Sequence, residues 1–264
     1  MNISLAPEPI FHLGAFPITN TLLMAWMVIA VLVLMAFIVR GKLSAVPKGA
    51  QNLLESIFEF ALKTMNSVTG SRALSYKFFP VVMTIFLFVL LSNLIEIVPG
   101  LGTIGLWETD HGKEVLVPFI RSASADLNVT LAIAVVSVLA TQILGIAALG
   151  AFKYAGKFIV PPWKPPYVIG TFVGALELVA EAAKVVSFSF RLFGNIFAGE
   201  VLLTVALFLV PYLVPLPFLF LEIFVGLVQA VVFSMLTLVF MKMAVTGHEE
   251  HSDHGIERHS EARA

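Results

Sequence analysis

The sequence contains no cysteine and little charge. Without a thiol the chain has no cysteine nucleophile, no thiolate metal site and no thioether attachment of haem. Charged residues make up 12% of its 264 residues and hydrophobic residues 59%, whereas a typical soluble domain is about 25% charged. A compact fold of this size still exposes roughly a quarter to a third of its unfolded surface. The composition therefore excludes a soluble enzyme, a disordered chain and a disulfide scaffold, and it indicates an integral membrane protein.

Further function classes are excluded by what the charges and motifs lack. Sixteen basic residues balance 17 acidic ones, so no basic excess points to nucleic acid. Neither a glycine-rich phosphate loop nor a Ser/His/Asp grouping is evident. We expect no bound cofactor and no metal site, and we do not expect the chain to be an enzyme by itself.

Five apolar segments are long enough to cross a membrane, which takes about 20 residues in a helix. Together they predict an all-α integral membrane protein whose 264 residues form a single membrane domain. The polar, histidine-containing residues 247–264 are expected to be a disordered tail. The predicted crossings are residues 18–39, 78–98, 127–152, 168–210 and 218–245.

Residues 47–68 form a different kind of segment. Apolar residues recur there at helical spacing, with polar residues between them. This pattern predicts an amphipathic helix in the membrane interface. The alternative is a helix that packs against a partner subunit.

Charge placement predicts the topology. Segments 40–77 and 153–164 are rich in lysine and arginine, whereas segment 99–126 is mainly acidic. Basic loops stay in the cytoplasm, so we expect the N-terminus outside and the C-terminus inside. All three segments agree with five crossings.

The fourth segment, residues 168–210, is too long for an upright helix. As one helix it extends about 65 Å, roughly twice the hydrocarbon thickness. It is either one tilted, bent helix or two helices. With the fifth segment, across the proline-rich turn at residues 211–217, it is expected to form a long, steeply tilted hairpin.

Polar residues on the fourth segment share one helical face about 80° wide. A charge near the bilayer centre costs at least about 2.5–3.5 kcal/mol, which makes such residues functional candidates by default. The alternative is a set of buried pairs, such as Glu181 with Lys184. The residues on this face are Glu177, Glu181, Lys184, Arg191 and Asn195.

The fifth segment carries Glu222 and Gln229 seven residues apart, hence on one face. One antiparallel register brings Gln229 level with Arg191 and Glu222 level with Glu200. A glutamate can relay protons, whereas an arginine stays charged. The pattern therefore predicts a proton path with a fixed barrier at Arg191, and the carboxylate that meets this arginine must come from another chain.

The run SFRLFGNIFAGE, from Ser189 to Glu200, closely resembles the signature of the subunit a family of F-type ATP synthases. The resemblance covers about residues 20–245 in the same order. Supporting matches are residues 92–94 with Pro99 and Gly100, residues 124–130, and Gln229 with Ala230.

The resemblance implies a stator beside a rotating c-ring, in which each ring subunit bears one carboxylate. Two offset half-channels lead to the ring from opposite sides. Arg191 is the implied arginine that separates the half-channels and faces the ring carboxylates. Asn195 and Gln229 are its implied polar neighbours, and Glu200 and Glu222 are implied to line the outer half-channel.

Further positions carry implied roles in the same way. Glu177 and Ser187, with Lys184 nearby, match positions of the cytoplasmic half-channel. Asp126 and Asn128 match polar positions where the outer loop enters the membrane. The implied partners are the c-ring, the b subunits of the peripheral stalk, the lipid bilayer and the transported protons.

The sequence departs from the family at the outer half-channel. Many relatives place a histidine at one of the two positions that Glu200 and Glu222 occupy here. Two close carboxylates cannot both ionise cheaply, so one of them is expected to hold a proton. Which one is left open, and protons are expected rather than sodium.

Two other functions fit a membrane protein. A self-contained proton-coupled transporter needs an internal carboxylate near Arg191 and a midplane substrate site, and a scaffold without transport needs no charged stripe. The expected location is a bacterial inner membrane, with the mitochondrial inner membrane as the alternative.

Overall fold

The computed structural model describes residues 6–14, 16–40, 49–98, 104–110, 113–156, 158, 167–211 and 213–246. The predicted tail at 247–264 lies outside the described residues, as does most of the proline-rich connection before the fourth segment.

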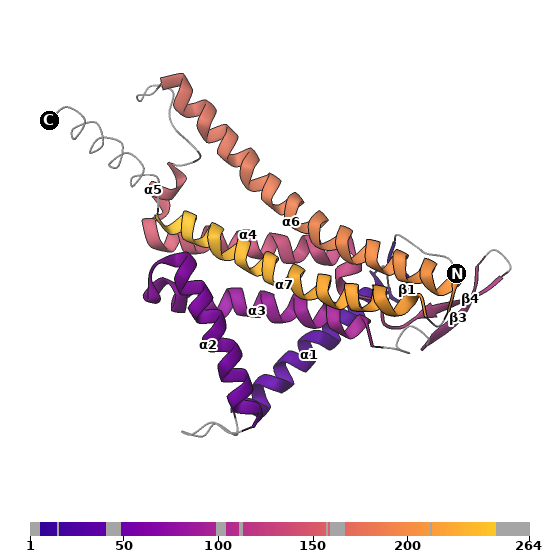
Figure 1. The fold of residues 1–264 in the computed structure, drawn as a ribbon. Helices are drawn as coiled ribbons and strands as arrows, with labels where there is room; N and C mark the ends of the chain where they lie inside the picture. The colour runs from indigo at the N-terminus through magenta and orange to yellow at the C-terminus, as the bar shows by residue number, and fades with distance from the viewer. Residues whose placement is uncertain are drawn as a thin grey trace.

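Five helices are long and apolar enough to cross a membrane, which confirms the all-α membrane fold. They alternate in direction, so successive loops lie at opposite ends of the bundle (Figure 1). The fourth segment is one continuous helix rather than two. The five are α1 (Asn20–Arg40), α3 (Arg72–Glu96), α4 (Leu127–Leu149), α6 (Tyr167–Leu209) and α7 (Pro215–Thr246).

Backbone chemistry explains where these helices begin and end. α7 starts at Pro215, and proline suits a first helical turn because the amide it lacks has no partner there. α4 ends at Gly150, whose φ of 84° is open to glycine at little cost. After it, the short helix α5 (Ala151–Ala155) places Tyr154 against Gln142 and Gly145 of α4. The third crossing is therefore shorter than the predicted 127–152.

The helix α2 (Ala50–Thr69) corresponds to the predicted amphipathic segment 47–68. Its C-terminal half packs inside the chain, where Met65 is buried in a cluster with Phe78 and Leu238. Lys242 Nζ donates to the Val68 carbonyl over 2.9 Å. Its N-terminal half runs away from the bundle (Figure 1). One end of α2 therefore belongs to the core, and the interfacial position of the other end stays a prediction.

Two β-hairpins, which the sequence did not predict, lie at the end of the bundle opposite α2 (Figure 1). The first pairs β1 (Pro9–Leu13) with β2 (Phe16–Thr19). The second pairs β3 (Gly105–Asp110) with β4 (Lys113–Pro118). These antiparallel pairs lie outside the helical body and leave its class unchanged.

The core lies where α3, α4, α6 and α7 meet. Phe188 and Leu192 of α6 pack there with Phe233 of α7 and Val89 of α3. Small polar side chains join the helices, as where Ser137 and Thr237 hydroxyls lie 2.8 Å apart. Such contacts are a main source of helix association where no water is present. α6 leaves this core toward its N-terminal end, running obliquely to α4 and α7 (Figure 1). The tilt of the α6–α7 hairpin in a bilayer stays a prediction.

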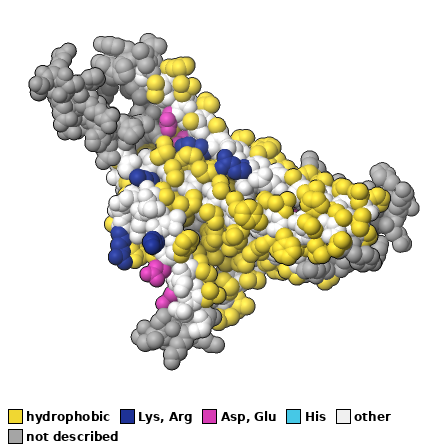
Figure 2. Space-filling model, in the orientation of Figure 1, with side chains coloured by type: hydrophobic (Ala, Val, Ile, Leu, Met, Phe, Trp, Pro, Cys, Tyr) yellow, Lys and Arg dark blue, Asp and Glu magenta, His cyan; other side chains and the backbone are white. Residues whose placement is uncertain are grey.

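The surface agrees with lipid contact. On the face drawn in Figure 2, the half toward the β-hairpins is almost wholly hydrophobic, and charged side chains gather toward the α2 end. Large exposed side chains include Phe37, Phe208 and Phe224, which are 67%, 88% and 63% exposed. The chain is thus a multi-pass membrane protein.

We predict that Gly226→Ala separates α3 from α7. A Cβ at this position lies only 3.1 Å from Asn93 Cβ, and Asn93 Nδ2 donates to the Gly226 carbonyl over 3.1 Å. Overpacking of this kind costs about 1–3 kcal/mol, so the melting temperature of the full chain in detergent should fall. The neighbouring Leu227→Ala, at an exposed position, is the control. Equal effects of the two changes would contradict the close contact.

Candidate functional site

Arg191 lies near the middle of α6 and its side chain is exposed on the outside of the bundle. Its Nη2 donates to Ser187 Oγ, one turn earlier on the same helix, over 3.4 Å. Among the described residues no carboxylate forms an ion pair with it. The structure thus presents a cation outward from the middle of an apolar helix.

Asn195 and Gln229 meet across the α6–α7 interface. Asn195 Nδ2 donates to Gln229 Oε1 over 2.9 Å. Gln229 is buried, and its Nε2 has no hydrogen-bond partner among the described residues. Gln229 therefore pairs one turn away from Arg191, rather than at the level of Arg191 as the predicted register has it. One buried amide donor is left beside the arginine's helix.

Glu222 of α7 approaches α6 at Gly199. Its Oε1 lies 3.0 Å from the point that a Cβ at residue 199 would occupy. The missing side chain of Gly199 therefore makes room for the carboxyl group. Glu222 is 8% exposed, and no described residue forms an ion pair with it. This contact agrees, within one residue, with the register that set Glu222 level with Glu200.

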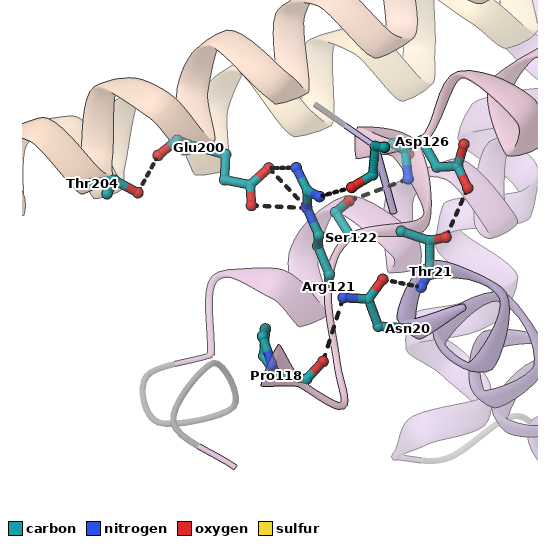
Figure 3. A network of polar contacts seen from close by, with 10 residues as sticks. Asn20, Thr21, Pro118, Arg121, Ser122, Asp126, Glu200 and Thr204 are labelled. Atoms are coloured by element: carbon teal, nitrogen blue, oxygen red, sulfur yellow. Dashed lines mark hydrogen bonds and ion pairs between the residues drawn. The ribbon is translucent and has the colours of Figure 1, made fainter. Parts of the chain in front are cut away.

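Glu200 has a partner that the sequence analysis missed. This partner is Arg121, which lies just before the 3₁₀ helix η2 (Ala123–Ala125). Its side chain extends toward α6 and contacts the carboxylate of Glu200 (Figure 3). Arg121 Nε donates to Oε1 over 3.0 Å, and Nη2 donates to Oε2 over 3.0 Å. The side chains are 8% and 25% exposed, respectively. A two-pronged pair of this geometry is the strong form of an ion pair.

Asp126 and Asn128 prove very different in their surroundings. Asp126 caps α4: its Oδ1 accepts from the Asn128 backbone amide over 2.8 Å. Its Oδ2 accepts from the Thr21 hydroxyl of α1 over 2.7 Å (Figure 3). Asp126 is 4% exposed, whereas the side chain of Asn128 is exposed. The buried member of the pair thus ties two helices together.

A second polar group lies toward the N-terminal part of α6. Lys184 Nζ lies 2.6 Å from Glu181 Oε1, as the alternative of buried pairs allowed. The same ammonium lies 4.6 Å from the ring centre of Phe240 on α7. Glu177, one turn before Glu181, is partly buried. This group is separated from Arg191 by about two turns of helix.

Tyr154 of α5 lies close enough to Glu181 and Glu177 to be affected by their charges. Its hydroxyl donates to Gln142 Oε1, and its ring packs where Gly145 has no side chain. Burial, followed by the negative charges of Glu181 and Glu177, raises the pKa of Tyr154 to about 12. Tyr154 thus remains a protonated donor at neutral pH.

The structure therefore brings the predicted residues together in three groups along α6. Glu177 and Lys184 belong to one group, and Ser187, Arg191, Asn195 and Gln229 form the middle one. Glu200 and Glu222 belong to the third, at the end of the bundle that carries the β-hairpins. Asp126 lies in the same region as Arg121, which contacts Glu200 of this third group (Figure 3).

This arrangement defines a class: a multi-pass membrane protein with ionisable side chains placed along its last two helices. Residues 22–242 match the protein family described as ATP synthase A chain. The chain is 33% identical to ATP synthase subunit a of Moorella thermoacetica, over 92% of this chain and 98% of that protein. It is 34% identical to ATP synthase subunit a of Helicobacter pylori, over 89% of this chain and 95% of that protein. The chain belongs to the ATP synthase A chain family.

We predict that Asp126→Ala destabilises the chain, whereas Asn128→Ala does not. The first change removes a helix cap and leaves Thr21 without its acceptor, at a cost of about 1–3 kcal/mol. The second removes an exposed side chain and keeps the backbone amide that the cap uses. Thermal unfolding of both variants in detergent gives the comparison. Equal melting temperatures for Asp126→Ala and the unchanged chain would contradict the capping role.

Proposed function

We propose that the chain is the proton-conducting stator subunit of an F-type ATP synthase and that Arg191 separates its two half-channels. The c-ring turns against the face of α6 that presents Arg191. Each ring carboxylate meets the guanidinium once as it passes. Proton flow through the two half-channels is thereby coupled to rotation and to ATP synthesis in partner subunits.

One observation carries this proposal: a guanidinium in the middle of an apolar helix faces outward with no acid of the described chain bound to it. An unpaired charge at this depth is expensive. A carboxylate on a neighbouring membrane helix removes that cost. Because arginine stays protonated, it accepts the carboxylate as a partner without passing a proton across the barrier.

The groups on either side of Arg191 provide the two half-channels in this proposal. Glu200 and Glu222, with Asp126 and Asn128 at the loop, belong to the outer one. The buried Gln229 Nε2, with no described partner, offers a donor to a water molecule or an arriving carboxylate beside the barrier.

The cytoplasmic half-channel runs past Glu177, Lys184 and Ser187. The ion pair of Lys184 with Glu181 keeps a charged group at that entrance. The long exposed stretch of α6 beyond the core leaves this side open to solvent or to a partner (Figure 1).

The proposal includes an orientation and a location. The β-hairpin end faces outward and the α2 end faces the cytoplasm, since the basic segments around α2 and α5 lie at the latter end. The membrane is a bacterial inner membrane, and the b subunits of the peripheral stalk hold the chain against rotation.

A self-contained proton-coupled transporter fits the contacts less well. Such a protein needs its own carboxylate near Arg191. Glu181 instead pairs with Lys184, and Glu200 pairs with Arg121. These two acids of α6 thus bind other cations, and Arg191 is left for a partner chain.

Arg191→Ala should abolish coupled ATP synthesis by the assembled complex, because ring carboxylates then pass without a barrier and protons leak. The measurement is the rate of ATP synthesis by reconstituted complex under an imposed proton gradient. Val186→Ala, which shortens an exposed apolar side chain on another face of the same helix, is the control and should retain most of the rate. Full coupled synthesis by assembled Arg191→Ala complex would overturn the proposal.

Gly199→Ala should slow proton entry from the outer side without destabilising the helix. The added methyl group meets Glu222 Oε1 at 3.0 Å and pushes the carboxyl group aside, whereas alanine is the better helix former by about 1 kcal/mol. Synthesis rate and melting temperature are measured together. A lower rate with an unchanged or higher melting temperature is expected, and an unchanged rate would remove this contact from the path.

A further inference from the structure

We infer that Arg121 is a positioning residue that keeps Glu200 as a fixed carboxylate, so that Glu222 alone of the two glutamates carries protons in the outer half-channel. This inference rests on the proposed function and answers a question that the sequence left open. It assigns different tasks to two acids that share one end of the α6–α7 hairpin.

The geometry around Glu200 supports the fixed charge. Both of its carboxylate oxygens accept from Arg121, over 3.0 Å each, and Nε lies 3.3 Å from the second oxygen. A guanidinium can only donate. Both oxygens of Glu200 are therefore used as acceptors by a partner that only donates.

Arg121 itself is held in place. Its side chain is buried, and Nη1 donates to the carbonyl of Ala6 over 3.4 Å. Its backbone leads into η2, where Ser122 Oγ accepts from the Ser124 amide over 3.3 Å. Contacts within the loop therefore fix the orientation of the Arg121 guanidinium toward α6, and this side chain does not rotate freely as an exposed one would.

Glu222 has the opposite surroundings. It is buried against the bare backbone of Gly199, and no described residue donates a hydrogen bond to it or pairs with it. A proton can leave Glu222 without breaking any contact that the structure shows.

The other polar groups near this end do not take over the task. Asp126 has both oxygens bound, to the Asn128 amide and the Thr21 hydroxyl. Gln229 lies two turns along α7 from Glu222 on the same face and has no proton to exchange at neutral pH. A proton that reaches Glu222 is thus directed along α7 toward Gln229 and the ring.

A set of substitutions in the complete, reconstituted ATP synthase tests this assignment through the rate of gradient-driven ATP synthesis. Arg121→Gln should lower the rate by about tenfold or more, because Glu200 is left as an uncompensated, partly buried acid. Arg121→Lys should restore most of the rate. Arg121→Gln combined with Glu200→Gln should also restore much of it, because neither charge of the pair then remains.

Glu222→Gln supplies the second arm of the test. It should abolish synthesis both in the otherwise unchanged chain and in the combined Arg121→Gln, Glu200→Gln background. Substantial synthesis by either Glu222→Gln complex would overturn the inference. So would a combined variant that is no better than Arg121→Gln alone, since Arg121 would then act other than through Glu200.

The amount of c-ring that co-purifies with each variant shows whether the complex has assembled. If the Arg121→Gln complex does not assemble, the synthesis rates of two other complexes still decide the assignment. These are the double variant Arg121→Gln, Glu200→Gln, which should be active, and Glu222→Gln, which should be inactive. Arg191→Ala in the same assay keeps the two proposals apart. Coupled synthesis by the Arg191→Ala complex contradicts the proposed function. If Arg191→Ala loses synthesis but Glu222→Gln keeps it, only the inference about Arg121 and Glu222 is contradicted.

Discussion

The cost of an unpaired charge in hydrocarbon governs the arrangement of this protein. α6 carries five charged residues in an otherwise apolar helix, and several of them have a partner of opposite charge. Lys184 lies on Glu181, and Arg121 crosses from the outer loop to Glu200. Arg191 alone among the cations of α6 has no described acid and points outward. Under the proposed function, Arg191 is therefore the arginine that takes its partner from another chain, because Lys184 and Arg121 already have acids within this one.

Close helix packing and the polar site depend on the same residues of α7. Gly226 lets Asn93 of α3 approach and accepts its hydrogen bond. Four residues earlier, Glu222 uses the space that Gly199 leaves on α6, and three residues later Gln229 binds Asn195. One face of α7 thus fixes α3 and α6 and also holds the polar side chains between them. A change on this face of α7 therefore affects both the helix packing and the polar contacts of the site.

The sequence predicted the elements that periodicity and length determine. The five crossings follow from apolar runs, and the common face of Glu177 and Arg191 follows from helical spacing alone. The β-hairpins did not follow, because their strands are short and carry no repeated alternation long enough to distinguish them from loops. The Arg121–Glu200 pair did not follow either. Seventy-nine residues separate its partners, and only the return of the outer loop onto α6 brings them together. Arg121 gave no signal beyond one positive charge in an acidic loop.

Asp126 shows how a residue at the loop end of the proposed outer half-channel can act through structure rather than by carrying a proton. Its carboxylate caps α4 and accepts from Thr21 of α1, so it fixes the point where the outer loop joins the bundle. Arg121 lies five residues before it, on the far side of η2. A shift of the Asp126 cap therefore moves the stem of Arg121, and with it the guanidinium that binds Glu200. Under the proposed function, the hydrogen bond between Thr21 of α1 and Asp126 at the start of α4 therefore helps to position the charge of Glu200 in the outer half-channel. A polar residue at this position can thus influence conduction while its own oxygens stay bound to the protein.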